Sequence, residues 1–168
     1  MPAPNNRQDE GKQVMPTDLR TWLDERTLAG VVLEAQQAVE PMHWKQSGVL
    51  LNPDEPRPQV LLTLLTYAYA AGTLPSEEIE RATEKDSTFR YLCARTYPTE
   101  SILRRFRRQN RILIRQCLAK VFEAACQQRF GKSPSAGLSQ LWLPALLNLE
   151  AEKRILYAVQ LDCMAMDV

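Results

Sequence analysis

The sequence has few of the residues that carry metal or redox chemistry. It holds a single histidine, His43, and four cysteines, none of which forms a Cys-x-x-Cys pair. His43 has no cysteine or carboxylate at metal-ligand spacing, so a zinc site is not expected. We therefore expect no cofactor, and we expect the thiols of Cys93, Cys117, Cys126 and Cys163 to be reduced and packed.

The sequence patterns of common catalytic sites are also missing. There is no G-x-x-x-x-G-K-[ST], no G-x-S-x-G and no H-E-x-x-H in the chain. His43 stands beside Trp44, a setting more typical of a surface or packing residue than of a catalytic base. We expect no enzyme activity.

Long hydrophobic runs are missing as well. The longest, residues 60–72, is interrupted by threonines and spans about a dozen residues, short of the roughly 20 that cross a membrane. Residues 1–16 are polar, lack the apolar core of a secretory signal and bury too little surface to offset ordering entropy. We expect a disordered tail over 1–16 and a cytoplasmic protein without a membrane partner, nucleoid-associated if it binds DNA.

Apolar residues recur at helical spacing after residue 17, and strand-like alternation is scarce. This predicts an all-α fold, a compact multi-helix bundle over residues 17–130, with a linker and a C-terminal helix over 131–168. Capping and breaking residues predict helices from Thr17 or Asp18 to Pro41, from Pro58 to Gly72, from Ser76, from Asp86 or Ser87, from Thr99 to Gly131, and from Pro144 to Met166.

The predicted helix that begins at Thr99 concentrates positive charge. Residues 101–132 hold nine lysines or arginines and one glutamate, a charge of +8, whereas the remainder holds twelve basic and nineteen acidic residues, a charge of −7. Arg104, Arg108, Arg111 and Arg115 share one helical face, where like charges repel. Phosphates are partners that match guanidinium geometry, so the pattern favours duplex DNA.

Another interpretation is that these arginines pair with the acid-rich segment before them. Its members are Glu77, Glu78, Glu80, Glu84 and Asp86. A solvated charged face is common on helices, but six arginines within residues 104–115, with no acid among them, exceed the usual pattern. Nucleic acid is therefore the preferred interpretation.

Four motifs occur in order within this region. An aromatic-rich, glycine-terminated segment (64–72) precedes a Ser-x-x-Ile-Glu-Arg-Ala helix (76–82), an Asp-x-x-Phe-Arg-Tyr-Leu phrase (86–92) and a segment ending in Arg-Arg-Phe-Arg-Arg (98–108). Their order and spacing resemble the N-terminal domain of bacterial DDE-type insertion-sequence transposases. The similarity covers roughly residues 55–125.

This resemblance implies a helical, helix-turn-helix-like domain that helps a transposase hold transposon ends. In such a module the start of the second helix reaches base edges, so residues 99–104 are expected nearest the bases. The expected partners are duplex DNA and either a second copy of the chain or a transposase. The DNA-contacting residues, carried over by position or taken from the arginine face, are Ser76, Arg81, Arg90, Thr99, Ser101, Arg104, Arg105, Arg107, Arg108, Arg111 and Arg115.

The catalytic half of such transposases has no counterpart in the pattern. Members of the family continue into an RNase H-like domain whose first carboxylate ends an Asp-Gly-Thr-like strand, whereas here Asp162 is followed by Cys163. Two-metal catalysis needs several carboxylates on a rigid scaffold, and we expect Asp162 and Asp167 to lie on a frayed terminus. The sequence thus favours DNA binding, at transposon ends or a regulatory site, without catalysis.

Two alternatives remain open at this stage. The apolar last helix, with Leu149 and Leu156, is compatible with a helical protein–protein interaction or oligomerisation module that no longer binds DNA. A decayed reading frame without a selected function is the other alternative. Residues 130–168 show no resemblance to the transposase family.

Overall fold

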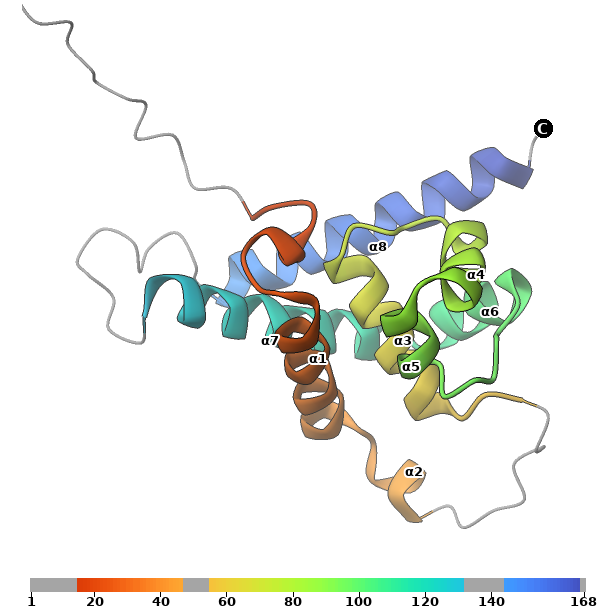
Figure 1. Cartoon of the computed structure of the whole chain (residues 1–168), viewed down its shortest axis with the longest axis horizontal. Helices are drawn as coiled ribbons and strands as arrows, with labels where there is room; N and C mark the ends of the chain where they lie inside the picture. Colours follow the sequence, from red (N-terminus) through yellow and green to blue (C-terminus); the bar gives the residue numbers. More distant parts are fainter. Residues whose placement is uncertain (1–14, 47–54, 132–143, 167–168) are drawn as a thin grey trace, which may run out of the picture.

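The computed structural model describes residues 15–46, 55–131 and 144–166, and every regular element in these ranges is a helix (Figure 1). The predicted all-α bundle is confirmed. None of these helices combines the length and the apolar composition of a membrane span. The elements are η1 (Leu19–Thr21), α1 (Glu25–Val39), α2 (Met42–Gln46), α3 (Pro58–Ala70), α4 (Ser76–Lys85), α5 (Ser87–Leu92), α6 (Glu100–Gln109), α7 (Arg111–Phe130) and α8 (Pro144–Met166).

Helix α3 is the centre of the bundle. It is apolar almost all round, so it must be covered on every side, and all residues from Leu61 to Ala70 are buried. Helices α1, α5, α6 and α7 pack against it. Tyr67 meets Phe89 of α5 edge to face, with 5.2 Å between ring centroids. The helix predicted over this segment is confirmed.

Helix α8 lies beside α7 and runs in the opposite direction (Figure 1). Leu147, Ala151, Ile155 and Ala158 form its buried stripe, with the spacing of four, four and three that marks one helical face. These four residues belong to the same hydrophobic core as α3. The last helix, which was expected outside the bundle of residues 17–130, is therefore an integral layer of it. The predicted linker at 133–143 lies outside the described residues.

The N-terminal helix predicted from Thr17 or Asp18 is interrupted. Asp18 accepts a hydrogen bond from the Arg20 backbone N–H at 2.8 Å and caps η1, while Asp24 accepts from the Thr27 N–H at 2.9 Å and caps α1. Aspartate side chains compete for backbone donors in this way, so two caps six residues apart produce two helices. The predicted end before Pro41 is confirmed.

The long basic helix predicted from Thr99 to Gly131 is two helices. Asn110 has φ −128° and ψ 29°, and its side-chain amide donates to the Phe106 carbonyl at 3.1 Å, which ends α6 before α7 begins. Short polar side chains that bond the nearby backbone interrupt helices by this route. The predicted cap at Thr99 and stop at Gly131 are confirmed.

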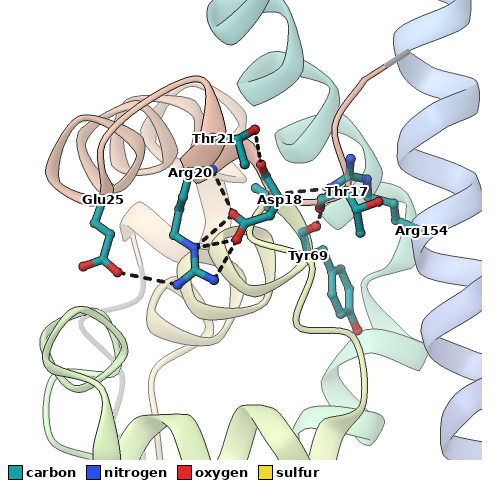
Figure 2. A network of polar contacts seen from close by, with 8 residues as sticks. Thr17, Asp18, Arg20, Thr21, Glu25, Tyr69 and Arg154 are labelled. Carbon is teal, nitrogen blue, oxygen red and sulfur yellow. Dashed lines mark hydrogen bonds and ion pairs between the residues drawn. The ribbon is translucent and has the colours of Figure 1, made fainter.

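Arg154 of α8 anchors the segment before η1 (Figure 2). Its Nη1 donates to the carbonyls of Thr17 and Tyr69, each at 2.8 Å, and its Nη2 donates to the carbonyl of Pro16. Met15 is buried in the core. Residues 15 and 16 are thus packed, contrary to the expected disordered tail, and residues 1–14 lie outside the described part of the chain.

Gly72 allows the chain to turn sharply after α3. Its φ is +80°, and a Cβ at this position would lie 2.8 Å from the Thr17 carbonyl oxygen. We expect Gly72→Ala to lower the free energy of unfolding by about 1–3 kcal/mol, measured by urea denaturation. Alanine is strained at this positive φ, and its methyl group would collide with the Thr17 carbonyl oxygen.

Gly30 supplies the matched control for that change. It lies on the exposed side of α1, where a Cβ would have nothing within 4 Å. Gly30→Ala is expected to raise the free energy of unfolding by up to about 1 kcal/mol, since alanine is the better helix former. Equal effects of the two substitutions would contradict the close approach of Gly72 and Thr17.

Candidate nucleic-acid interface

Arg107 of α6 and Asp162 of α8 form a buried ion pair at the centre of the basic region. Arg107 Nη2 lies 2.7 Å from Asp162 Oδ2, and Arg107 Nη1 donates to the Tyr69 hydroxyl at 3.2 Å. Ser76 completes the shell of Asp162, because its backbone N–H donates to Oδ1 at 2.9 Å and its hydroxyl donates to Oδ2 at 2.6 Å. Asp162 thus ties α8 to the first residue of α4 and to α6.

The surroundings of Asp162 favour its charged form. Burial by itself would raise the pKa of this carboxyl, but the hydrogen bonds from Ser76 and the Arg107 guanidinium hold the pKa below its usual value. Asp162 is 3% exposed. It was expected on a frayed terminus, and it is instead fixed by Ser76 of α4 and Arg107 of α6.

Three arginines of the predicted face, Arg104, Arg111 and Arg115, also have carboxylate partners. Arg104 pairs with Glu100 at 3.3 Å and lies 3.6 Å from Asp162. Arg111 forms a close ion pair with Glu152 of α8, and Arg115 lies 4.0 Å from the other oxygen of the same carboxylate. Two carboxylates of α8, Asp162 and Glu152, therefore lie within 4.0 Å of four of the six arginines in residues 104–115.

Within the described residues, the acid-rich segment of α4 does not pair with the arginines of α6 and α7 as the alternative interpretation of the sequence suggested. Glu77 pairs with Arg81 on the same helix, and Glu80 accepts a hydrogen bond from the Glu100 backbone N–H at 2.9 Å. Glu80 therefore helps to cap α6 in place of neutralising its arginines. The arginines do find acidic partners, but α8 supplies most of them.

Two of the predicted DNA-contacting residues are buried. Ser76 is fully buried with its hydroxyl on Asp162, and Arg107 is 6% exposed. Ser76 was also expected to cap α4, whereas Pro75 occupies that position. Arg104 is mostly covered, with 18% of its side chain exposed. The structure removes Ser76 and Arg107 from the accessible set, because burial against α8 leaves no room for a nucleic acid.

Six predicted residues remain exposed, and three of them line the outer face of α6. Ser101, Arg105 and Arg108 follow one another at spacings of four and three, so they share that face. Arg105 is 3.9 Å from Glu55 in an exposed pair, and Arg108 makes no ion pair within the described residues. The other exposed members are Arg81, Arg90 and Thr99.

The loop between α5 and α6 adds residues that the sequence interpretation missed. Ala94, Arg95 and Tyr97 have φ values of 50°, 60° and 44°, in the left-handed region that such side chains rarely adopt. Arg95 and Tyr97 are both exposed next to the start of α6. Strained, exposed residues of this kind cluster at binding sites. No glycine or asparagine in the loop signalled this conformation.

The four cysteines differ in exposure. Cys93, Cys117 and Cys126 are buried, and burial raises the pKa of the Cys117 and Cys126 thiols to about 11. Cys163 is exposed, contrary to the expectation that all four thiols are packed. The described residues contain no group of three or more histidine, cysteine or carboxylate side chains placed to hold a metal ion.

Comparison with known proteins gives no match to this chain among protein-family models, curated proteins or solved structures. The resemblance to transposases therefore rests on the four motifs within residues 64–108.

Proposed function

We propose that this protein binds duplex DNA without catalysis, in the manner of a transposase N-terminal domain, through the outer face of α6 and the loop before it. The observation that carries the proposal is the exposed row of Ser101, Arg105 and Arg108, which continues into Arg95 and Tyr97 of the strained loop. Hydroxyl, guanidinium and aromatic groups exposed on a helix and on the loop before it suit contacts to phosphates and base edges.

The packing of α6 supports a role as the inserted helix. Leu103 and Phe106 point into the core, and the Arg107 side chain is held by Tyr69 and Asp162. The opposite face is therefore presented by a rigid element, and little order has to be gained on binding. Thr99 caps the helix by accepting from the Ile102 N–H at 3.4 Å, which leaves Ser101 as the first exposed side chain of the helix.

The other exposed cations suit backbone contacts. Arg90 of α5 and Arg81 of α4 are exposed on helices that pack against each other, and α4 also packs against α6. In helix-turn-helix complexes, residues outside the inserted helix hold the phosphates and set its register. Arg81 has a partial competitor in Glu77, with which it pairs.

A salt-dependent binding measurement tests the proposal. We expect Arg105→Glu combined with Arg108→Glu to weaken binding of a labelled duplex, measured by fluorescence anisotropy across salt concentrations. Loss of two phosphate contacts should lower the slope of log affinity against log salt by about 1.8, since each contributes about 0.9.

The control variant is Arg26→Glu combined with Lys153→Glu. Both side chains are exposed on other helices, α1 and α8, and the pair changes the net charge by the same amount. It should keep nearly the wild-type slope. Equal losses in the two double variants would mean that only net charge attracts DNA, and no binding at low salt would refute the proposal.

A second candidate function is self-association or protein binding through α8. Its outward face carries Leu146, Leu149, Leu156, Tyr157 and Met164, all exposed by 43% or more. Contiguous apolar residues on a helix surface are typical of interaction sites. This candidate requires an oligomer in solution whose assembly depends on Leu149 and Leu156.

A further inference from the structure

A cavity of about 370 Å³ lies where α6, the start of α7 and the end of α8 meet. One wall holds Arg104, Arg107, Arg108 and Arg111, and the other holds Val159 and Asp162 of α8. Its volume falls in the range of small-molecule sites. Ser101 and Arg105 are not among its lining residues, whereas Arg108 both lines the cavity and belongs to the exposed row of α6.

The cavity is lined by more hydrogen-bond donors than its own acceptors can bind. Four guanidinium groups line it against one carboxylate, Asp162. Arg107 is satisfied by Asp162 and Tyr69. Arg104 Nε is buried without a hydrogen-bond acceptor among the described residues, and its nearest carboxylate oxygen is 3.6 Å away. A buried donor left in this state is costly, and an anion in the cavity would satisfy it.

Arg108 adds an uncompensated charge to this donor set. Its side chain lines the cavity and makes no ion pair within the described residues. Arg111 reaches Glu152 on one side, but a guanidinium carries five N–H donors and the pair uses only part of them. Val159 and Met166 also line the cavity, so its lining combines charged and apolar side chains.

We propose that this cavity binds a phosphate group, held by Arg104, Arg108 and Arg111, with the organic part of the ligand against Val159 and Met166. Arginine forks match phosphate oxygens in a bidentate way, and three of them from two helices enclose a doubly charged group. The proposal goes beyond the DNA-binding face, because the ligand is either a small phosphorylated molecule or a backbone phosphate that reaches the cavity.

Cys163 provides a direct reporter of occupancy. It lines the cavity and is exposed, whereas the other three cysteines are buried. We expect inorganic pyrophosphate to slow alkylation of Cys163 by iodoacetamide in the full chain, while potassium chloride at equal ionic strength does not. The modified residue is identified by mass spectrometry. Equal slowing by the two salts would overturn the proposal.

Two variants locate the effect. Arg108→Gln, a change at an exposed side chain that leaves the buried ion pair intact, should raise the pyrophosphate concentration needed for protection by about tenfold, the effect of one charge-assisted contact. Val159→Glu places a carboxylate in the cavity and should abolish protection while urea denaturation confirms folding. Wild-type protection in both variants would refute the site.

Arg105→Glu separates this site from the DNA-binding face. Arg105 does not line the cavity, so pyrophosphate should protect Cys163 in this variant as in the wild type, even where DNA binding is weakened. A mononucleotide and a short duplex then distinguish the source of the phosphate. Protection by the duplex that is lost in Arg105→Glu identifies a backbone phosphate, and protection by the mononucleotide alone identifies a small ligand. Failure of all three probes in the wild type would overturn the proposal.

Discussion

Replacing Arg154 with methionine is expected to lower the free energy of unfolding by about 3–5 kcal/mol, because a buried cation with several backbone partners is lost. Arg154 donates to the carbonyl oxygens of Thr17 and Tyr69 (Figure 2), and it also donates to those of Pro16 and Ala70. The residues Tyr69 and Ala70 are fully buried, so removing the guanidinium leaves carbonyl acceptors that solvent does not reach.

The position of Arg154 explains the size of the expected loss. Tyr69 and Ala70 end α3, where the last carbonyls lack the usual partners within the helix. The Tyr69 carbonyl accepts a long hydrogen bond from the Gly72 N–H at 3.3 Å, and a cation at this end also meets the negative end of the helix dipole. The guanidinium lies 4.7 Å from the centroid of the Phe122 ring, which adds a cation–π contact. Burial lowers the pKa of Arg154, but an arginine remains protonated at neutral pH.

Lys153→Met is the matched control. Lys153 precedes Arg154 on α8, is exposed, and undergoes the same loss of charge and gain of methionine. Its effect should stay within about 0.5 kcal/mol by urea denaturation at neutral pH. A similar small loss for Arg154→Met would mean that the N-terminal segment is not anchored by this side chain. Arg154→Lys should give an intermediate loss, since lysine keeps the charge without the fork.

The parts of the fold that could be predicted from the sequence depend on local signals. The uniform apolar run of α3, Pro58 at its start, Gly72 at its end and Asp86 before α5 all act within one helical turn. The two wrong predictions of continuous helices also have local causes. Asp24 and Asn110 interrupt apolar patterns that continue on both sides, and periodicity alone does not register a competing side-chain cap.

The site was harder to predict because its partners are distant in the chain. The arginine face was interpreted as an unpaired row, since the nearby acids lie on α4. The carboxylates that meet it come from Glu152 and Asp162, and Asp162 reaches Ser76 across 86 residues. Charge counted along a segment cannot reveal such pairing. Arg105 and Arg108 are exposed whereas Arg107 is buried, and a count of arginines along the segment does not distinguish the exposed residues from the buried one.

Asp162→Asn is expected to lower the free energy of unfolding by about 3 kcal/mol at neutral pH, because Arg107 would remain buried without its anion. Asparagine keeps the shape of the side chain and an acceptor for the Ser76 N–H, so the loss of stability measures the contribution of the negative charge. Glu152→Gln is the control: its partner Arg111 is 40% exposed, and removing that ion pair should cost less than about 1 kcal/mol. Similar losses in both variants would contradict the central role of Asp162.

The effect of Asp162→Asn should also depend on pH in one direction. The pKa of Asp162 is lower in the folded protein than in the unfolded chain, so its stabilising contribution is complete above the unfolded value of about 4 and is lost as the pH falls through the folded value. The gap between wild type and variant should be constant from about pH 5 to 7 and shrink below about pH 4. Asp18, whose pKa is also lowered, is present in both proteins and cancels. A gap that stays constant down to acid unfolding would show that Asp162 is not held as an anion by Arg107 and Ser76.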